Sequence, residues 1–258
     1  MLVRTDIDDG VATVTLYRPD NMNAFNFELA EDLYNALREA AINDKVKLVI
    51  LRGHGKTFCA GGDVKVMHES DNKPKCLRDM TQAIHKCVIE ITSMKKPVIS
   101  AIHGFAVGAG LGLALSCDIR IAVKGTKFNT GFLGIGLAPG CGTHFLTKVL
   151  PYNRAAELVF LSKPFTSHEA LDWGLINHEV ADMNEMEKKL EEYKAYFRRS
   201  PSVAVGMSKQ LLQASYTNTL QEHLELESQT ASKSAGCEDF SEGVKAFYEK
   251  RKPNFHGR

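Results

Sequence analysis

The segment that decides the fold runs from Pro97 to Gly112 and reads PVISAIHGFAVGAGLG. Its first half, Pro97–His103, is a largely apolar run that predicts a buried strand. Its second half leads into Gly108–Leu115, whose small and aliphatic residues predict a helix. A strand-to-helix turn presents unpaired N–H groups at the positive end of the helix dipole. Small residues at this turn therefore let a ligand oxygen come close to the backbone.

A second glycine-rich turn lies upstream at Phe58–Asp63, after the predicted strand Val46–Arg52 and before a short helical stretch. Two such turns facing each other would aim two N–H donors at one oxygen, forming an oxyanion hole for the enolate of a thioester. Either glycine cluster alone is also typical of a tight turn or of close helix packing. A dinucleotide-binding fingerprint is disfavoured, because Gly112 falls one residue early and the next strand ends at Lys124 rather than at an acidic residue.

The rest of the chain predicts strands alternating with helices, followed by helices alone. It opens as a hairpin of Leu2–Ile7 and Val11–Tyr17. Further helices at Phe25–Ala41 and Leu77–Met94 and a strand at Asp118–Val123 imply parallel strands with helical crossovers. The later helices are expected at Arg154–Leu161, Ser167–Trp173, Met183–Arg199, Ser202–Ala214, Thr219–Thr230 and Glu238–Lys250. We therefore expect an α/β core over residues 1–180 and a helical C-terminal region over residues 181–258.

The composition is that of an ordinary soluble globular protein. The chain has 258 residues, of which 44% are hydrophobic and 24% charged. Its formal net charge of +1 argues against nucleic acid or an anionic membrane as a partner. No apolar run approaches the roughly 20 residues that a membrane span needs.

The six cysteines form neither a C-x-x-C pair nor a zinc-like spacing, so no metal site is expected. The N-terminus carries no secretory or transit signal, and a chain of this size without such a signal favours reduced thiols over a disulfide framework. We therefore expect a cytoplasmic protein with free cysteines.

Seven motifs in order along the chain point to one family. They are Phe58–Asp63, Pro97–Gly104, Gly108–Gly110, Cys117–Ala122, Gly136–Gly140, Glu169–Leu175 and Phe247–Pro253. Each motif alone is weak, but in this order the sequence resembles the crotonase (enoyl-CoA hydratase/isomerase) superfamily over essentially its whole length. The resemblance implies an α/β fold, a crotonase-like spiral of β-β-α turns with a C-terminal helical region. It also implies an acyl-CoA substrate, no cofactor beyond the coenzyme A of that substrate, and a homotrimer or a hexamer.

The resemblance also assigns site residues. It places the two oxyanion-hole donors at the N–H groups of Gly62 and Ala109. The residues that it places against coenzyme A are Asn21, Met22, Ala24, Ala60, Asp63, Lys65, Phe247 and Lys250. The last two often reach coenzyme A from a neighbouring subunit or on a moving C-terminal helix. This gives the basic run Lys250–Lys252 a role with coenzyme A phosphates, although a solvated helix end is an equally simple interpretation.

The catalytic acids are where this sequence departs from the family that it resembles. Hydratases of that family use two glutamates, and at their positions this chain has Gly112 and Phe132. Some isomerases use an aspartate just after the position of Pro139, and here that residue is Gly140. Neither glycine nor phenylalanine transfers a proton. The turn Pro139–Thr143 is also one residue shorter than in the hydratases.

These substitutions disfavour hydration and favour decarboxylase or isomerase chemistry, because the oxyanion hole needs only backbone. Decarboxylation of a malonyl-type or glutaconyl-type thioester generates the enolate without a base, and an apolar wall at Phe132 would promote loss of a carboxylate. The alternative is a catalytically silent acyl-CoA-binding or assembly subunit.

Other polar side chains near the two turns have structural as well as functional interpretations. His68 and Glu69 are expected to face solvent on a mobile loop, His68–Lys75, that serves as a lid. Asn129 and Thr130 lie beside the substituted Phe132 and are candidates to hold a water or a carboxylate. The sequence also leaves open whether Cys141 and His144 line the pocket, whereas His103 and Asp118 are expected to be structural.

Overall fold

The computed structural model describes all residues, Met1–Arg258. A twisted sheet of six strands forms the centre, in the order β1-β2-β3-β4-β6-β9. The antiparallel hairpin of β1 and β2 stands at one edge, and every other pair is parallel, as the sequence predicts. The strands are β1 Val3–Asp8, β2 Val11–Leu16, β3 Leu48–Gly53, β4 Val98–Ile102, β6 Ile119–Val123 and β9 His178–Val180.

A second, smaller sheet branches off where the first one ends. It consists of β5 Phe105–Val107, β7 Lys127–Asn129 and β8 Phe165–Thr166. A strand of the large sheet followed by a short strand of the small sheet and then a helix gives one turn of the crotonase-like spiral. Such a turn runs through β4, β5 and α4 Ala109–Ser116.

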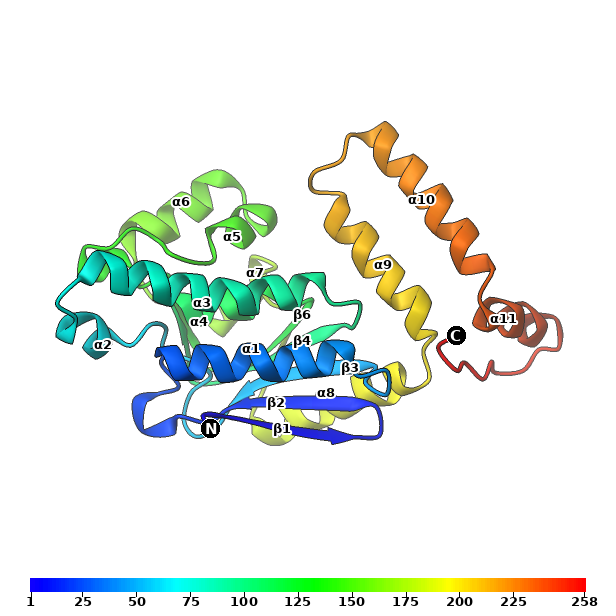
Figure 1. The fold of residues 1–258 in the computed structure, drawn as a ribbon, viewed down its shortest axis with the longest axis horizontal. Coiled ribbons are helices and arrows are strands. Elements are labelled where there is room, and N and C mark those ends of the chain that lie inside the picture. The colour runs from blue at the N-terminus through cyan, green and yellow to red at the C-terminus, as the bar shows by residue number, and fades with distance from the viewer.

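Alternation along the central strands divides the core between the two faces of the large sheet. In β3, Val49 and Leu51 belong to a cluster of 40 buried residues, whereas Leu48 and Ile50 belong to a second cluster of 10. The first face is covered by α1 Phe27–Ile42 and α3 Lys73–Ser93 (Figure 1). The opposite face is covered by α8 Met183–Arg198.

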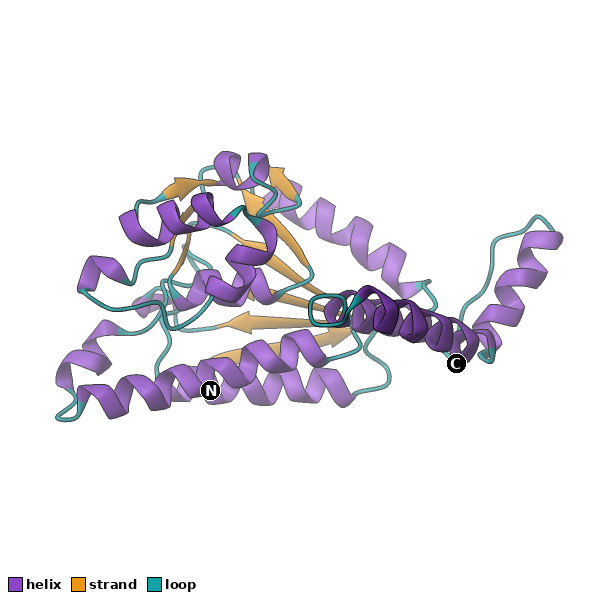
Figure 2. Ribbon diagram, turned by 90° about the horizontal axis from the view of Figure 1, so that it is seen from above, coloured by secondary structure: helices purple, strands orange, loops and turns teal.

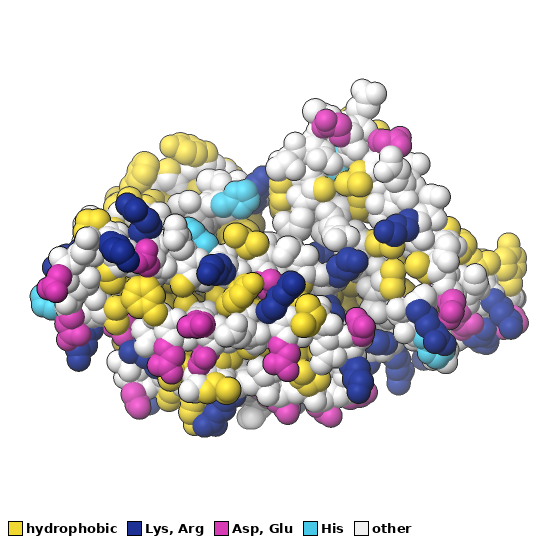
Figure 3. Space-filling model, viewed as in Figure 1, with side chains coloured by type: hydrophobic (Ala, Val, Ile, Leu, Met, Phe, Trp, Pro, Cys, Tyr) yellow, Lys and Arg dark blue, Asp and Glu magenta, His cyan; other side chains and the backbone are white.

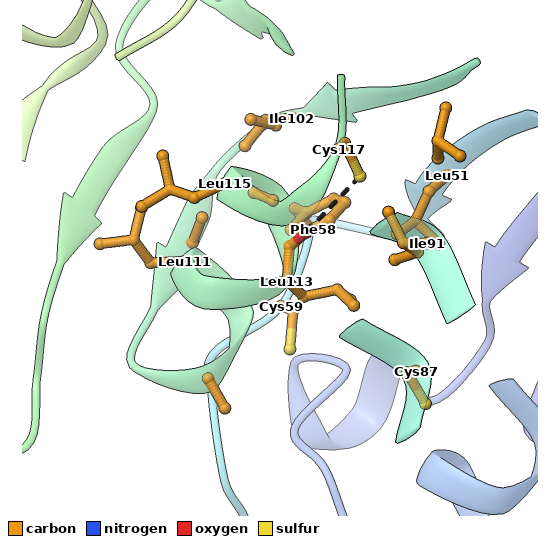
Figure 4. Packing of buried hydrophobic residues seen from close by; sticks show 14 of the residues in the cluster. Leu51, Phe58, Cys59, Cys87, Ile91, Ile102, Leu111, Leu113, Leu115 and Cys117 are labelled. Carbon is orange, nitrogen blue, oxygen red and sulfur yellow. Dashed lines mark hydrogen bonds between the residues drawn. The ribbon is translucent and has the colours of Figure 1, made fainter. Parts of the chain in front are cut away.

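Helix α4 lies at the centre of the larger cluster, and all eight of its residues are buried. Figure 4 shows apolar side chains around it from several elements, among them Phe58, Ile91 and Ile102. The Cys117 thiol donates to the Leu113 carbonyl at 3.5 Å and closes the end of this helix. The N-terminus of α4 is therefore held rigidly, which matters because it supplies one expected oxyanion donor.

The remaining helices surround this core or extend from it. They are α2 Val64–Glu69, α5 Thr143–Val149, α6 Tyr152–Leu161, α7 Ser167–Asp172, α9 Ser202–Ala214, α10 Leu220–Ala235 and α11 Glu238–Tyr248. Figures 1 and 2 show α9, α10 and α11 projecting from the core as an arm. Because α8 packs on the sheet, the projecting arm begins at α9, and the division at residue 181 stays a prediction.

The face of the molecule seen in Figure 3 carries both signs of charge, interspersed over the core and the arm, with apolar side chains between them. No helix is long and apolar enough to cross a membrane.

Candidate active site

The first glycine-rich turn leaves the Gly62 N–H without a protein acceptor. The Phe25 N–H donates to the Gly61 carbonyl at 2.7 Å, and the Asp63 N–H donates to the Phe25 carbonyl at 2.8 Å. This short bridge pairs both neighbours of Gly62 and omits its own N–H. Gly61 has φ +98°, and a Cβ there would lie 2.8 Å from the Val107 carbonyl oxygen, so only glycine fits.

The second turn leaves the Ala109 N–H free in the same way. Ala109 is the first residue of α4, where no carbonyl of the helix accepts its N–H. Gly108 precedes it with φ +53° and ψ −117°, a conformation that favours glycine. The two turns lie side by side, since the Cys59 N–H donates to Phe105 O at 3.1 Å and the Val107 N–H donates to Cys59 O at 3.0 Å.

Both free N–H groups belong to the lining of one cavity of ≈ 170 Å³. The other walls come from α2 and α3, through Met67, Met80 and Ile84, and from the segment after β7, through Phe132, Leu137 and Cys141. The lining contains no aspartate, glutamate, histidine, lysine, arginine or tyrosine. Burial raises the pKa of the Cys141 thiol to about 11, so this side chain is a neutral thiol at physiological pH. The cavity can therefore stabilise an anionic oxygen but has no side-chain base.

Comparisons with known proteins identify the family. The family model for enoyl-CoA hydratase/isomerase matches residues 6–258. The chain belongs to this family. It is 33% identical over 261 residues to 1,2-epoxyphenylacetyl-CoA isomerase of Escherichia coli, an alignment that covers 99% of this chain and 98% of the relative. It is 30% identical to trans-2-decenoyl-[acyl-carrier-protein] isomerase of Streptococcus mutans, with coverage of 98% and 97%.

Solved structures of the enoyl-CoA hydratase/isomerase family share the fold. The enoyl-CoA hydratase of Bacillus anthracis superposes with a TM-score of 0.94 at 28% identity, over 100% of both chains. The enoyl-CoA hydratase of Mycobacterium smegmatis gives the same TM-score at 27% identity, over 99% of both chains. The expected crotonase-like α/β fold is thus confirmed.

Of the two positions where the hydratases carry glutamates, position 112 is closed by packing and position 132 holds an aromatic ring in the cavity wall. A Cβ on Gly112 would lie 2.5 Å from the Cys141 Sγ and 3.1 Å from the Gly142 nitrogen. The short turn before α5 therefore occupies the space into which a side chain at position 112 would grow. The Phe132 ring lies beside the second oxyanion turn, within 3.7 Å of where a Cβ on Gly108 would stand. No carboxylate fits at position 112 unless this turn moves.

We expect Gly112→Ala to lower the free energy of unfolding by about 1–3 kcal/mol, the usual cost of overpacking a filled core. The added methyl group meets Cys141 and the Gly142 backbone, and chemical denaturation measures the loss. Gly134→Ala is the matched control, because nothing lies within 4 Å of a Cβ there. A Gly112→Ala variant as stable as this control would contradict the packing. Adding Cys141→Ala should recover only part of the loss, since the backbone contact remains.

The other polar candidates point away from the cavity. The Thr130 hydroxyl donates to the Leu158 carbonyl at 3.0 Å, and the Asn129 side chain accepts from the Gly131 N–H at 2.8 Å. Both residues therefore stabilise the turn behind Phe132, and neither lines the cavity. They are not placed to hold a water or a carboxylate in it, which was one interpretation of the sequence. His144 does not line it either, whereas Cys141 does.

The expected lid is more structured than the sequence predicts. His68 and Glu69 are exposed, as expected, but they lie in the last turn of α2. Helix α3 begins at Lys73, so only residues 70–72 form a loop. Val64 and Met67 of α2 contribute to the cavity wall. The sequence predicted a short helical stretch after Asp63, but not that it extends through Glu69 or that α3 begins as early as Lys73.

The segment expected to contact coenzyme A lies against the first oxyanion turn. The Met22 carbonyl accepts from the Ala60 N–H at 3.0 Å, and Asn21 and Met22 are exposed. Ala24 is buried, and its carbonyl accepts from the Arg18 guanidinium at 2.8 Å. The exposed part of this segment thus borders the cavity-lining turn.

Asp63 is held by an arginine that the sequence did not single out. Its carboxylate pairs with Arg18 at 2.7 Å and caps α2 by accepting from the Lys65 N–H at 3.0 Å. The side chain is therefore occupied within the protein, while Lys65 itself is exposed and lies 3.8 Å from Glu69. Of these charges, Lys65 is the one that remains exposed to solvent.

Phe247 and Lys250 do not join the cavity of their own chain. Helix α11 lies at the end of the arm, far from α2 in Figures 1 and 2. Phe247 is 81% exposed, and Lys250 is exposed as well. Arg251, by contrast, is paired with Glu242 through both terminal guanidinium nitrogens at 2.6 and 2.9 Å. The basic run is therefore reduced to Lys250 and Lys252.

Proposed function

We propose that this family member decarboxylates a malonyl-type or glutaconyl-type CoA thioester through an enolate. The observation that carries the proposal is a cavity with two unpaired N–H donors, at Gly62 and Ala109, and a thiol as its one ionisable side chain. Decarboxylation suits such a site because the substrate supplies the electron pair, whereas hydration needs a group that activates water.

In the proposed step, carbon dioxide leaves as the bond from its carbon to the α-carbon breaks in a malonyl-type thioester, or the bond to the γ-carbon in a glutaconyl-type thioester. The electron pair moves toward the thioester carbonyl, whose oxygen becomes negative and accepts from Gly62 and Ala109. Solvent then returns a proton to the α-carbon of the enolate, or to the α- or γ-carbon of the dienolate left by a glutaconyl-type thioester. The apolar wall with Phe132 and Met67 offers the carboxylate no hydrogen bond, so it is poorly solvated before it leaves.

Isomerisation is the nearest alternative, since two relatives are isomerases by name. It requires a base that removes one proton and returns another. No carboxylate or imidazole lines this cavity. Decarboxylation is therefore favoured.

We further propose that coenzyme A extends from the cavity past Asn21, Met22 and Lys65. Its adenine base would meet Phe247 and its phosphates Lys250 of a second copy of the chain, in a homotrimer or hexamer. The position of α11 at the far end of the arm supports a contribution from another copy over one from the same chain.

The test incubates the pure protein with malonyl-CoA, methylmalonyl-CoA, glutaconyl-CoA, crotonyl-CoA and a 3-enoyl-CoA, with product detection by mass. Loss of carbon dioxide from one of the first three supports the proposal. Fast hydration of crotonyl-CoA would overturn the assignment of Gly112 and Phe132. Binding of coenzyme A without turnover of any thioester would favour a catalytically silent acyl-CoA-binding subunit.

The pH dependence separates these mechanisms further. Cys141 is protonated below its pKa of about 11, and its charged fraction grows only as pH rises toward that value. No cavity group changes charge between pH 6 and pH 9, so we expect kcat for decarboxylation to stay flat across this range. A general base would instead give a rising limb near its pKa. Initial rates in buffers of constant ionic strength measure this, and a limb near pH 6–7 would reveal a base outside the described lining.

A further inference from the structure

Helix α11 is held mainly by the end of its own chain. Lys250 adopts the left-handed conformation with φ +52°, and the Arg251 N–H donates back to the Ala246 carbonyl at 3.0 Å. The chain then reverses and runs along α11 toward its N-terminus. Residues 251–258, with the side chains of α11 that bind them, are called the clasp below.

Asp239, in the first turn of α11, is the inner anchor of the clasp. Its carboxylate accepts from the His256 N–H at 2.7 Å and from the Gly257 N–H at 2.8 Å, and only 4% of the residue is exposed. Its own N–H donates to the Arg258 carbonyl at 3.0 Å. Both oxygens of a buried carboxylate are thus satisfied by the tail.

Glu242, one turn further along α11, is the outer anchor. It receives the bidentate Arg251 pair and the Asn254 N–H at 2.8 Å. The Arg251 guanidinium and the Asn254 N–H lower the pKa of Glu242 to about 2, so this carboxylate stays charged in the folded protein down to about that pH. Between the two anchors the Phe255 ring packs on Gly243, 3.4 Å from where a Cβ would stand.

The clasp leaves one end of α11 open to solvent. Phe247 and Tyr248 are 81% and 80% exposed, and neither Lys250 nor Lys252 forms an ion pair. Hydrophobic side chains also stand at the outer end of the arm in Figure 3. Arg251 anchors the clasp through Glu242, while its neighbours Lys250 and Lys252 stay free. This arrangement holds two aromatic rings and two ammonium groups in one place without using them in the chain itself.

We propose that Asp239 and Glu242 are positioning residues: through the clasp they hold α11 so that Phe247 and Lys250 meet the nucleotide of coenzyme A bound to a second copy of the chain. This rests on the proposed function for the identity of the ligand. Neither carboxylate touches the ligand, and both act by fixing the helix. Aromatic rings stack on an adenine base, and ammonium groups pair with its phosphates.

The test uses Asp239→Asn and Glu242→Gln in the full chain, which remove acceptors without changing side-chain size. We expect Kd for coenzyme A, measured by calorimetry, and KM for the CoA thioester to rise about tenfold to a hundredfold, the effect of a lost charged hydrogen bond. We expect kcat to be unchanged. With the N-acetylcysteamine thioester of the same acyl group, which lacks the nucleotide, kcat/KM should equal that of the wild type.

Glu238→Gln is the matched control, because its pair with Arg258 is about 70% exposed on both sides and contributes little. Unchanged Kd for coenzyme A in both folded variants and in a chain truncated after Pro253 would overturn the proposal. An equal loss with both thioesters would also overturn it, since that indicates a general structural role. Failure of the proposed reaction is distinct, because Kd for coenzyme A reports on the clasp even if no thioester is decarboxylated.

Discussion

Ala109→Pro is expected to lower kcat by about 10²–10³, because it removes one of the two proposed oxyanion donors. Proline fits the local backbone, since Ala109 is the first residue of α4 and its N–H has no protein acceptor. The preceding Gly108 has no Cβ to clash with the proline ring. The decarboxylation assay measures the change, and thermal unfolding checks that the variant is folded.

Two measurements separate the lost donor from other effects of proline. Met183→Pro places proline at the first residue of α8, after the extended Asp182, and should leave kcat unchanged. Free coenzyme A has no thioester oxygen, so its Kd should be the same in Ala109→Pro and in the wild type. Undiminished turnover in a folded Ala109→Pro protein would mean that the oxyanion hole lies elsewhere.

The sequence predicted the parts of the site that depend on local backbone. A buried strand followed by glycines and a small-residue helix indicates a turn with free N–H groups, and the structure places Gly62 and Ala109 on one cavity. The sequence also showed that Gly112 and Phe132 replace the two glutamates of the hydratases, but it did not show the physical reason at position 112. It lies in the contact of Gly112 with Cys141 and Gly142, which only the packed turn before α5 creates.

Other features depend on partners far away in the sequence and had no local signal. The strands of the small sheet have only two or three residues, too few for an alternating pattern to be recognised. Thr130 turns from the cavity because the Leu158 carbonyl accepts its hydroxyl, and Asp63 is neutralised by Arg18. The clasp likewise joins Asp239 to a tail without any periodic pattern.

Lys209→Met is expected to lower the free energy of unfolding by up to about 3–5 kcal/mol, the cost of removing one partner of a buried ion pair, since the Lys209 side chain is buried and that of Asp118 is 21% exposed. Lys209 lies in α9, the first helix of the arm, and is 6% exposed. Its ammonium group binds Asp118 at 2.7 Å and the carbonyls of Ile91 and Lys96 at 2.7 and 3.0 Å. Methionine keeps the volume but leaves these acceptors unpaired. Urea denaturation gives the change in stability.

A double variant shows whether the loss of stability comes from the Asp118 carboxylate that Lys209→Met leaves unpaired. Asp118→Asn in the Lys209→Met background removes the unpaired charge and keeps an acceptor for the Val98 N–H, now 2.8 Å from Asp118. It should therefore be more stable than Lys209→Met alone, with a coupling of about 0.5–3 kcal/mol.

Lys75→Met is the surface control. Lys75 lies 2.6 Å from Asp79, closer than Lys209 lies to Asp118, but its side chain is 70% exposed. Because water and salt screen an exposed pair, this change should cost at most about 1 kcal/mol. Equal losses of stability in Lys75→Met and Lys209→Met would mean that burial of Lys209 does not strengthen its contribution to holding α9 against the core.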